Sequence, residues 1–302
     1  MSELHRFLFD GLPVRGVLVR LTDAWTEILR RHAAGNAATA YPLPVQNMLG
    51  EMLAAATLMQ SNIKFNGSLT LQIVGDGPVK LAVAEVQPDF GLRATATVIG
   101  EVAPAASLRE LVNVSSRGQC AITLEPKDKS PGQQAYQGVV SLSGQAGQAL
   151  ESLSLMLEHY MRQSEQLDTT LVLAADGGVA AGLLIQRLPH ADEVAGSEDY
   201  QRIALLAASL KRDELLTLEV ETILRRLFWQ EKLLRFEPVA APHFACSCSR
   251  ERVHHMILGL GRKEAHSLIV ERSEIEVGCD FCGAPYRFDA LDVAQIFHAT
   301  GP

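Results

Sequence analysis

Four cysteines close to the C-terminus constrain this chain more than any other feature of its sequence. Cys246 and Cys248 form a C-x-C motif, Cys279 and Cys282 form a C-x-x-C motif, and 30 residues separate the two pairs. The chain has one further cysteine, Cys120. Two close cysteine pairs joined by a domain-sized segment are typical of a tetrahedral zinc site made of thiolates, and equally of a reversible dithiol switch. The spacing alone leaves both interpretations open.

The composition excludes several classes of protein. Hydrophobic residues make up 47% and charged residues 21% of the 302 positions, as in ordinary globular proteins. The formal net charge of −8 argues against a general nucleic-acid binder, whose affinity depends on Lys and Arg side chains that neutralise phosphates. Glu3, His5, Arg6 and Asp10 interrupt any apolar N-terminal segment, so no secretory signal is indicated.

No apolar stretch reaches the roughly 18–20 residues of a membrane span. We therefore expect a cytoplasmic protein without a membrane partner. In that reducing compartment, clustered cysteines are metal ligands or redox-active thiols more often than permanent disulfides.

The patterns along the chain predict an α+β fold in three parts: a mixed α/β core at residues 1–190, a helical linker at 191–240 and a small C-terminal module at 241–302. Two helices are predicted in the core, at 42–65 and 145–163. Alternating apolar runs and turn residues predict strands at 68–86 (a hairpin around Gly75 to Pro78), 92–100, 119–125, 135–142 and 171–188 (a hairpin around Asp176 to Gly178).

The linker segment reads as helical at 201–210 and 213–234, with apolar residues at helical spacing. Asp213 is the predicted N-cap of the second helix, and Thr217 is a second candidate cap. Short amphipathic helices owe their stability to what they pack on. We expect the cysteine module to be one such packing partner.

The cysteine module fits a zinc site physically. Two ligands one or two residues apart come from one tight turn, and Gly278 and Gly283 flank the second pair, where a turn needs positive φ or close backbone approach. So small a segment needs a metal or disulfides to stay folded. Four histidines could compete as ligands, but with four thiols available we expect none to bind metal; they are His243, His254, His255 and His266. Cys120 lies in an apolar run, which predicts a buried core residue.

Beyond the cysteines, the sequence resembles a known family. The pattern FxCxCSRER from Phe244 to Arg252, followed by CDFCGxxYxFD from Cys279 to Asp289, is similar to the redox-regulated bacterial holdase family, the 33 kDa heat-shock chaperones. Segments such as RFLFDGLPVRGVLVRL, LGEMLAAATL and ETILRRLFWQE extend the resemblance nearly from end to end. Ser273 departs from it, because the resemblance implies Gly just before the strand that leads into Cys279.

The resemblance implies an α/β core, a helical linker and a zinc-binding redox switch. It implies one Zn²⁺ in the reduced form, held by Cys246, Cys248, Cys279 and Cys282. On oxidation it implies disulfides that join Cys246 to Cys248 and Cys279 to Cys282. The implied function is an ATP-independent chaperone, not an enzyme, that binds unfolded client proteins under oxidative stress and dimerises on activation. The absence of a GxxxxGK[ST] phosphate loop agrees with ATP independence.

Three other functions compete with this interpretation. A structural zinc-ribbon protein that binds nucleic acid needs a basic face, but Arg250, Arg252 and Arg287 are diluted by neighbouring glutamates. A zinc hydrolase needs an open coordination position, which four thiolates close. A thioredoxin-like oxidoreductase has its C-x-x-C at the start of a helix, whereas Pro285 follows this one closely.

Overall fold

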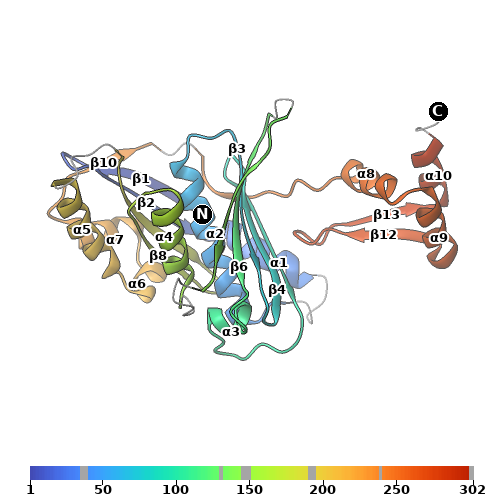
Figure 1. Cartoon of the computed structure of the whole chain (residues 1–302), viewed down its shortest axis with the longest axis horizontal. Helices are drawn as coiled ribbons and strands as arrows, with labels where there is room; N and C mark the ends of the chain where they lie inside the picture. Colours follow the sequence, from blue (N-terminus) through green and yellow to red (C-terminus); the bar gives the residue numbers. More distant parts are fainter. Residues whose placement is uncertain (35–39, 129–131, 144–150, 190–194, 238–239, 299–302) are drawn as a thin grey trace.

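The computed structural model describes residues 1–34, 40–128, 132–143, 151–189, 195–237 and 240–298. Two largely antiparallel sheets with one long helix, α2 (Leu43–Asn62), between them form the body of the molecule. A small module of helices and a hairpin projects from one end of this body (Figure 1). The mixed α/β architecture predicted from the sequence is therefore confirmed.

The first sheet is buried on both faces. Its five antiparallel strands lie in the order β10-β1-β2-β9-β8. They are β1 (Glu3–Phe9), β2 (Val14–Leu21), β8 (Thr169–Ala175), β9 (Ala180–Arg187) and β10 (Leu233–Phe236). Alternate residues of β2 and β9 belong to two different apolar clusters, one on each side of the sheet. The hairpin predicted around Asp176 is confirmed, and the Asp176 carboxylate accepts hydrogen bonds from the backbone N–H groups of Gly178 and Val179.

The second sheet has six strands in the order β11-β5-β4-β3-β6-β7. They are β3 (Gly67–Val74), β4 (Val79–Val86), β5 (Gly91–Val98), β6 (Gln119–Pro126), β7 (Tyr136–Ser141) and β11 (His243–Phe244). The predicted hairpin around Gly75 to Pro78 joins β3 to β4. Cys120 lies on β6 with no exposed surface, as predicted. The two-residue strand β11 is the one parallel member, paired with β5 at the edge of the sheet.

Helix α2 is apolar on nearly every side because both sheets cover it. Pro42 and Pro44 mark its start, as predicted. The other helices of the core are α1 (Asp23–Ala34), α3 (Leu108–Val112) and α4 (Leu153–Ser164). Helix α4 corresponds to the helix predicted at 145–163 and begins behind its N-cap Ser152. Residues 145–150 of that prediction lie outside the described part of the chain.

Three helices cover the outer face of the five-stranded sheet: α5 (Ala195–Ala208), α6 (Arg212–Thr217) and α7 (Val220–Phe228). Their buried side chains, among them Ile203 and Ile223, meet Phe7 and Phe9 of β1 in one apolar cluster. The ring of Phe228 packs edge-on against that of Phe9, with centroids 5.0 Å apart. These helices are therefore held by burial of apolar surface against the core.

The predicted helix at 213–234 is partly wrong. Asp213 lies in the first turn of α6 behind the N-cap Lys211, and Thr217 ends α6, whereas Glu219 is the N-cap of α7. The last residues of the prediction form β10 instead of a helix, because pairing with β1 satisfies their backbone groups. Tertiary pairing overrides the local helical pattern here.

The expected packing of the cysteine module on the linker helices is also wrong. Helices α5 to α7 lie at one end of the molecule and the cysteine module at the other (Figure 1). Strand β10 completes the five-stranded sheet, and β11 extends the six-stranded one. The division at residues 190 and 240 stays a prediction, since strands from both later segments pair with the core sheets. None of the helices in the described ranges combines the length and apolar character that a membrane crossing needs.

Candidate metal and redox centre

The cysteine module is a small assembly around a short hairpin. Its elements are α8 (Arg250–Leu260), α9 (Arg262–Arg272), β12 (Glu274–Gly278), β13 (Pro285–Asp289) and α10 (Ala290–His298). Seven apolar side chains are buried in its described residues, with Ile257 and Phe288 the most enclosed of the large ones. So small a core is well below what normally stabilises an independent fold. The module therefore needs another source of folding free energy.

The four predicted cysteines meet at the end of the module nearest the core. All four are free thiols, and their sulfur atoms lie within 4.8 Å of one another. The Sγ atoms of Cys246 and Cys279 are 3.7 Å apart, and those of Cys248 and Cys282 are 3.4 Å apart. These distances are far longer than the roughly 2.05 Å of a disulfide bond. The shortest approaches join the two motifs to each other.

The first motif lies between a strand and a helix. Strand β11 fixes the chain immediately before Cys246, and the hydroxyl of Ser249 accepts a hydrogen bond from the N–H of Arg252 as the N-cap of α8. Cys248 is thus adjacent to a helix N-terminus, whose partial positive charge favours a thiolate. The C-x-C sequence therefore spans the gap between two anchored elements.

The second motif forms the turn of the β12–β13 hairpin. The N–H of Cys279 donates to Ala284 O and the N–H of Gly283 donates to Cys279 O, which closes the turn. Gly283 has a φ of +70°, so the prediction of positive φ is confirmed there. Gly278 is extended and nothing lies within 4 Å of where its Cβ would be, so neither predicted reason for glycine applies to it.

The electrostatic environment differs among the thiols. Burial raises the pKa of Cys248, but hydrogen bonds from the Tyr286 hydroxyl, 3.1 Å away, and from the neighbouring thiols outweigh it and lower the pKa to about 7. Burial raises the pKa of Cys279 and of Cys282. Cys248 is therefore the first of these three to ionise. By contrast, burial raises the pKa of Cys120 in the core to about 12, which makes that thiol unreactive.

The sulfur positions fit a tetrahedral zinc ion. A Zn–S distance of about 2.3 Å in a regular tetrahedron places the sulfurs ~3.8 Å apart. The observed separations of 3.7 and 3.4 Å are close to that value. Among the described residues, no other group of three or more metal-binding side chains comes this close together. His243, His254, His255 and His266 are not members of this group.

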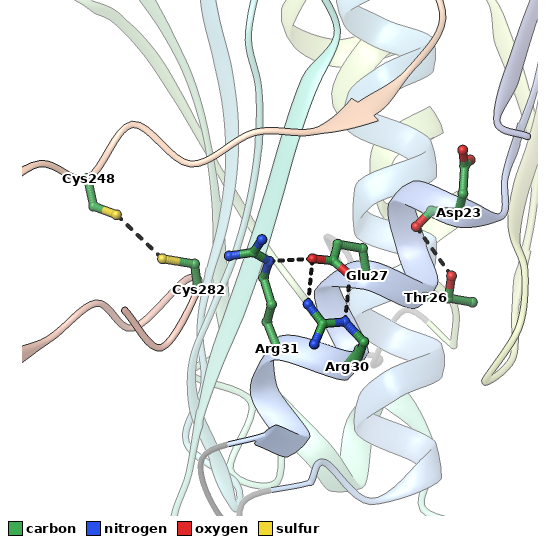
Figure 2. A network of polar contacts seen from close by, with 7 residues as sticks. All are labelled: Asp23, Thr26, Glu27, Arg30, Arg31, Cys248 and Cys282. Atoms are coloured by element: carbon green, nitrogen blue, oxygen red, sulfur yellow. Dashed lines mark hydrogen bonds and ion pairs between the residues drawn. The ribbon is translucent and has the colours of Figure 1, made fainter. Parts of the chain in front are cut away.

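The module contacts the core beside the sulfur cluster. Figure 2 shows Arg31 of α1 near Cys282, with its guanidinium bound to Glu27 at 2.6 Å. Hydrogen bonds from Arg30 and Arg31 lower the pKa of Glu27 to about 2. The Arg31 guanidinium also lies 4.3 Å from the ring centre of Phe244, two residues before Cys246. Helix α1 therefore helps to position the strand that precedes the first motif.

Arg93 of β5 forms a second contact across this boundary. Its guanidinium binds Glu85 at 2.6 Å, lies 4.2 Å from the ring centre of Phe281, and interacts electrostatically with Cys246. Burial lowers the pKa of Arg93, but its contacts with Glu85 and Cys246 more than offset this, so the pKa is raised.

A surface groove leads from solvent to Cys246. The six-stranded sheet contributes Glu85 and Arg93 to its lining, and the module contributes Ser247 and Arg252. A small oxidant can therefore approach this sulfur without prior unfolding.

Sequence reasoning missed Arg31, Arg93 and Tyr286 as parts of the site. The signal for Tyr286 was present, because it occupies the tyrosine position of the CDFCGxxYxFD pattern. Nothing in the local sequence distinguishes Arg93 from other strand arginines, since its role depends on a contact with residues more than 150 positions away.

The geometry disfavours two of the competing functions. The C-x-x-C motif lies in a hairpin turn, whereas a thioredoxin-like motif begins a helix. Of the basic residues near the cysteines, Arg250 is paired with Asp292 at 2.8 Å and Arg287 with Glu276 at 3.0 Å. These arginines are therefore engaged by carboxylates and offer little charge to a phosphate backbone.

Comparisons with known proteins agree with this geometry. A family model described as Hsp33 protein matches residues 2–289. The 33 kDa chaperonin of Chromobacterium violaceum is 45% identical over 297 residues, which cover 98% of this chain and 94% of that protein. The 33 kDa chaperonin of Shewanella woodyi is 41% identical over 299 residues, or 99% of this chain and 96% of that protein. That of Neisseria meningitidis is 40% identical over 294 residues, or 97% and 90%.

A solved structure shares the fold. The crystal structure of the 33 kDa chaperonin (HSP33) of Thermotoga maritima superposes with a TM-score of 0.77 at 21% sequence identity, with 98% of each chain covered. The family model and the curated relatives both extend over nearly all of the sequence. On these grounds the chain belongs to the Hsp33 protein family.

Proposed function

We propose that this protein is an ATP-independent molecular chaperone, a holdase, that is switched on when its four clustered cysteines are oxidised. The observation that carries the proposal is the cluster itself: four free sulfurs within 4.8 Å of one another in a module with a very small core. The names of the relatives, 33 kDa chaperonin, support a chaperone function.

In the reduced state, Cys246, Cys248, Cys279 and Cys282 are the ligands we propose for one Zn²⁺. A bound Zn²⁺ would hold all four sulfurs as thiolates and contribute roughly 10–16 kcal/mol of apparent binding free energy, as structural zinc does in finger peptides. Because a whole domain is typically stable by only about 5–15 kcal/mol, a module that loses its four ligands unfolds.

Oxidation removes the ligands by ordinary thiol chemistry. A thiolate attacks peroxide and becomes a sulfenic acid, and hydroxide leaves. The neighbouring cysteine then attacks the sulfur of the sulfenic acid, forms the S–S bond and releases the sulfenic oxygen as water or hydroxide. Each cysteine pair loses two electrons and one peroxide is reduced. We propose that the final pairs are Cys246 with Cys248 and Cys279 with Cys282, because each pair is adjacent in the chain after the module unfolds.

The signal then has to cross the molecule. Six residues separate the end of β10 from the start of β11, and these two strands lie at the edges of the two core sheets. When the module unfolds, β11 loses the support of Arg31 and Arg93 and leaves β5. Because β11 no longer holds the segment that follows β10, the β10–β1 pairing weakens. That pairing anchors helices α5 to α7 at their C-terminal end.

The proposed client surface is the apolar interface beneath these helices. On the sheet side it includes Phe7, Phe9 and Leu183, and on the helix side Ile203 and Phe228, all of them buried. Release of α5 to α7 exposes both halves at once. A large exposed apolar surface binds unfolded polypeptides without ATP.

The test compares two redox states of the same protein in a client assay. Light scattering follows the aggregation of citrate synthase during mild warming with reduced, zinc-loaded protein or with peroxide-treated protein. We expect protection only after oxidation. Equal protection in both states would contradict the proposed redox control. Zinc release, followed with a chromogenic chelator, and the count of free thiols should change in parallel with protection.

A control variant separates the cluster from other thiols. Cys120→Ala removes the buried thiol and should leave zinc content and activation unchanged, whereas Cys279→Ser combined with Cys282→Ser should abolish zinc binding.

Dimerisation on oxidation, a cytoplasmic location and the lack of nucleic-acid binding stay predictions. Molar mass from light scattering in each redox state tests the first of these.

A further inference from the structure

A partly open pocket in the core lies well away from the cysteine cluster. It is lined by the end of α2, strands β2 and β9, strands β6 and β7, and helix α4, and it has a volume of about 110 Å³. Most of its wall is apolar. Its apolar side chains include Met59, Ile63, Ile122, Leu124, Met161 and Leu184.

One side chain in this wall is a cation without an anion. The Arg15 guanidinium donates from Nε to Gln186 Oε1 at 3.0 Å, from Nη2 to the same oxygen, and from Nη1 to the backbone oxygen of Asn62 at 3.4 Å. All of these acceptors are neutral. Among the described residues, Arg15 forms no ion pair with a carboxylate, and burial lowers its pKa. Arg15 is half-buried, and a guanidinium taken partly out of water gains from a nearby anion.

The acceptor side of this arrangement is fixed. The Gln186 side chain is 1% exposed, and its Nε2 donates to the Thr169 hydroxyl at 2.7 Å. Its oxygen is therefore held toward Arg15. Since an arginine has five N–H donors, donors of Arg15 remain for a further acceptor.

A second donor in the same wall has no acceptor at all. Asn62 Nδ2 is buried without a hydrogen-bond partner in the described part of the molecule. A buried unsatisfied donor costs free energy, so its place next to an unpaired guanidinium calls for an explanation.

The protein does not supply the missing anion from the cavity wall. Glu165 also lines the cavity, but its Oε1 accepts hydrogen bonds from the hydroxyls of Tyr160 at 2.7 Å and Tyr136 at 3.0 Å. Both bonds are accepted by Oε1, and Glu165 forms no ion pair with Arg15 in the described part of the molecule. The wall therefore presents two donors, one of them charged, beside an apolar hollow.

We propose that this cavity binds a small monocarboxylate of four or five carbons. Its carboxylate accepts hydrogen bonds from Arg15 and Asn62, and its hydrocarbon body packs between Met59, Ile63 and Met161. An apolar cavity of ~150 Å³ holds benzene, which has six heavy atoms, so about 110 Å³ suits an acid of similar size, such as isobutyrate. A guanidinium that faces a carboxylate in an apolar setting gives a charge-assisted contact that a neutral amide cannot match.

Methionine methyl groups report directly on this site. The full-length reduced protein is labelled with [¹³C-methyl]methionine and titrated with isobutyrate, and separately with isobutyramide, at constant ionic strength. We expect saturable shifts of the Met59 and Met161 signals with isobutyrate and none with isobutyramide at the same concentrations. Met256, on the distant helix α8, is the internal control and should not shift.

Two variants complete the test. Arg15→Met should weaken isobutyrate binding at least tenfold, while the unchanged signals of Met48 and Met52 show that the core still folds. Ile63→Phe fills the hollow and should abolish binding with Arg15 in place. Equal binding of acid and amide, shifts spread over all methionines, or full binding by Arg15→Met would each overturn the proposal, as would an absence of any shift, which would mean a cavity filled only by water.

Discussion

The two ends of this molecule are held together by opposite means. At one end, helices α5 to α7 bury a continuous apolar cluster against the five-stranded sheet, with three phenylalanine rings in contact. At the other end, the cysteine module buries seven apolar side chains in its described residues and brings four sulfurs together. The first end is stabilised by apolar area removed from water, whereas we propose that metal binding by the four thiolates stabilises the second.

This difference teaches where sensitivity to oxidant resides. A thiol can be oxidised, whereas a buried leucine or phenylalanine cannot. The contrast between Cys120, with its pKa raised by burial to about 12, and Cys248, with its pKa lowered to about 7, makes the same point within one residue type. We therefore expect an oxidant to act directly on the module, and on the rest of the molecule only through the module.

The largest expected effect comes from loss of the proposed metal. A chelator, which would remove the ion, or Cys279→Ser combined with Cys282→Ser, which removes two of its ligands, should cost up to roughly 10–16 kcal/mol of apparent stabilisation and unfold the module. Trypsin should then cut after Arg262 and Arg272, which lie in α9, while the fluorescence of the buried Trp25 stays unchanged. Resistance of α9 to trypsin after chelation would contradict the comparison of the two ends.

The next effect is expected at the apolar end. Phe228→Ala removes a ring that packs on Phe7 and Phe9, at a cost of about 3–5 kcal/mol. Helices α5 to α7 should then detach in part, with faster amide hydrogen exchange and client protection before any oxidation. Leu205→Ala on α5 is the matched control, because Leu205 is 74% exposed. Equal exchange rates in both variants would show that this cluster does not hold the helices.

A smaller effect is expected where the module meets the core. Arg93→Met, combined with Glu85→Gln to avoid an unpaired buried charge, removes the contacts to Cys246 and Phe281, worth about 1–3 kcal/mol. Zinc release by peroxide should become several times faster. Arg272→Met, with a side chain that is 68% exposed, is the control. Unchanged release kinetics would mean that the core does not stabilise the reduced site.

The contact between α2 and α6 should make the stability of the protein depend on pH. Burial raises the pKa of Glu51 from 4.5 to about 7, and Arg212, 3.8 Å away, offsets this only in part. Because the folded protein holds this proton more tightly than the unfolded chain, stability is lost as pH rises from about 4.5 to 7 and is constant above.

Glu51→Gln removes this titration. Its free energy of unfolding should exceed that of the wild type by about 1–3 kcal/mol at pH 8 and should equal it near pH 4.5. Urea unfolding at the two pH values checks this. Parallel pH profiles for the two proteins would exclude Glu51 as the titrating group.

The smallest effect concerns one backbone angle in the module. Ser273 has a φ of +65° at the end of α9, a conformation that glycine adopts without strain. Ser273→Gly should therefore stabilise the module by about 1 kcal/mol and raise the chelator concentration needed to unfold it. Ser249→Ala, which removes the N-cap of α8, should act in the opposite direction by a similar amount.

The features that the sequence predicted correctly are those encoded locally. The hairpins around Gly75 to Pro78 and Asp176 to Gly178 follow from turn residues between apolar runs, and the start of α2 follows from Pro42 and Pro44. The cysteine cluster was predictable because ligand spacing is itself a local property. Ser273, just before β12, has a positive φ, which agrees with the glycine that the family resemblance implies at this position.

The features that were missed depend on contacts between distant segments. Strand β10 has the local pattern of a helix, and only its pairing with β1, more than 220 positions earlier, makes it a strand. Strand β11 is too short to show any period. The place of the module at the end opposite α5 to α7 follows from these two short pairings, which no local pattern contains.

The short strand β11 has one more consequence. It covers an edge of the six-stranded sheet, where His243 and Ala245 donate from their backbone N–H groups to the carbonyl oxygens of Phe90 and Leu92. When β11 departs, these backbone acceptors of β5 open to any extended polypeptide that can add a strand. An unfolded client chain that pairs there prevents β11 from returning. By mass action, bound client would therefore help to keep the protein in its activated state.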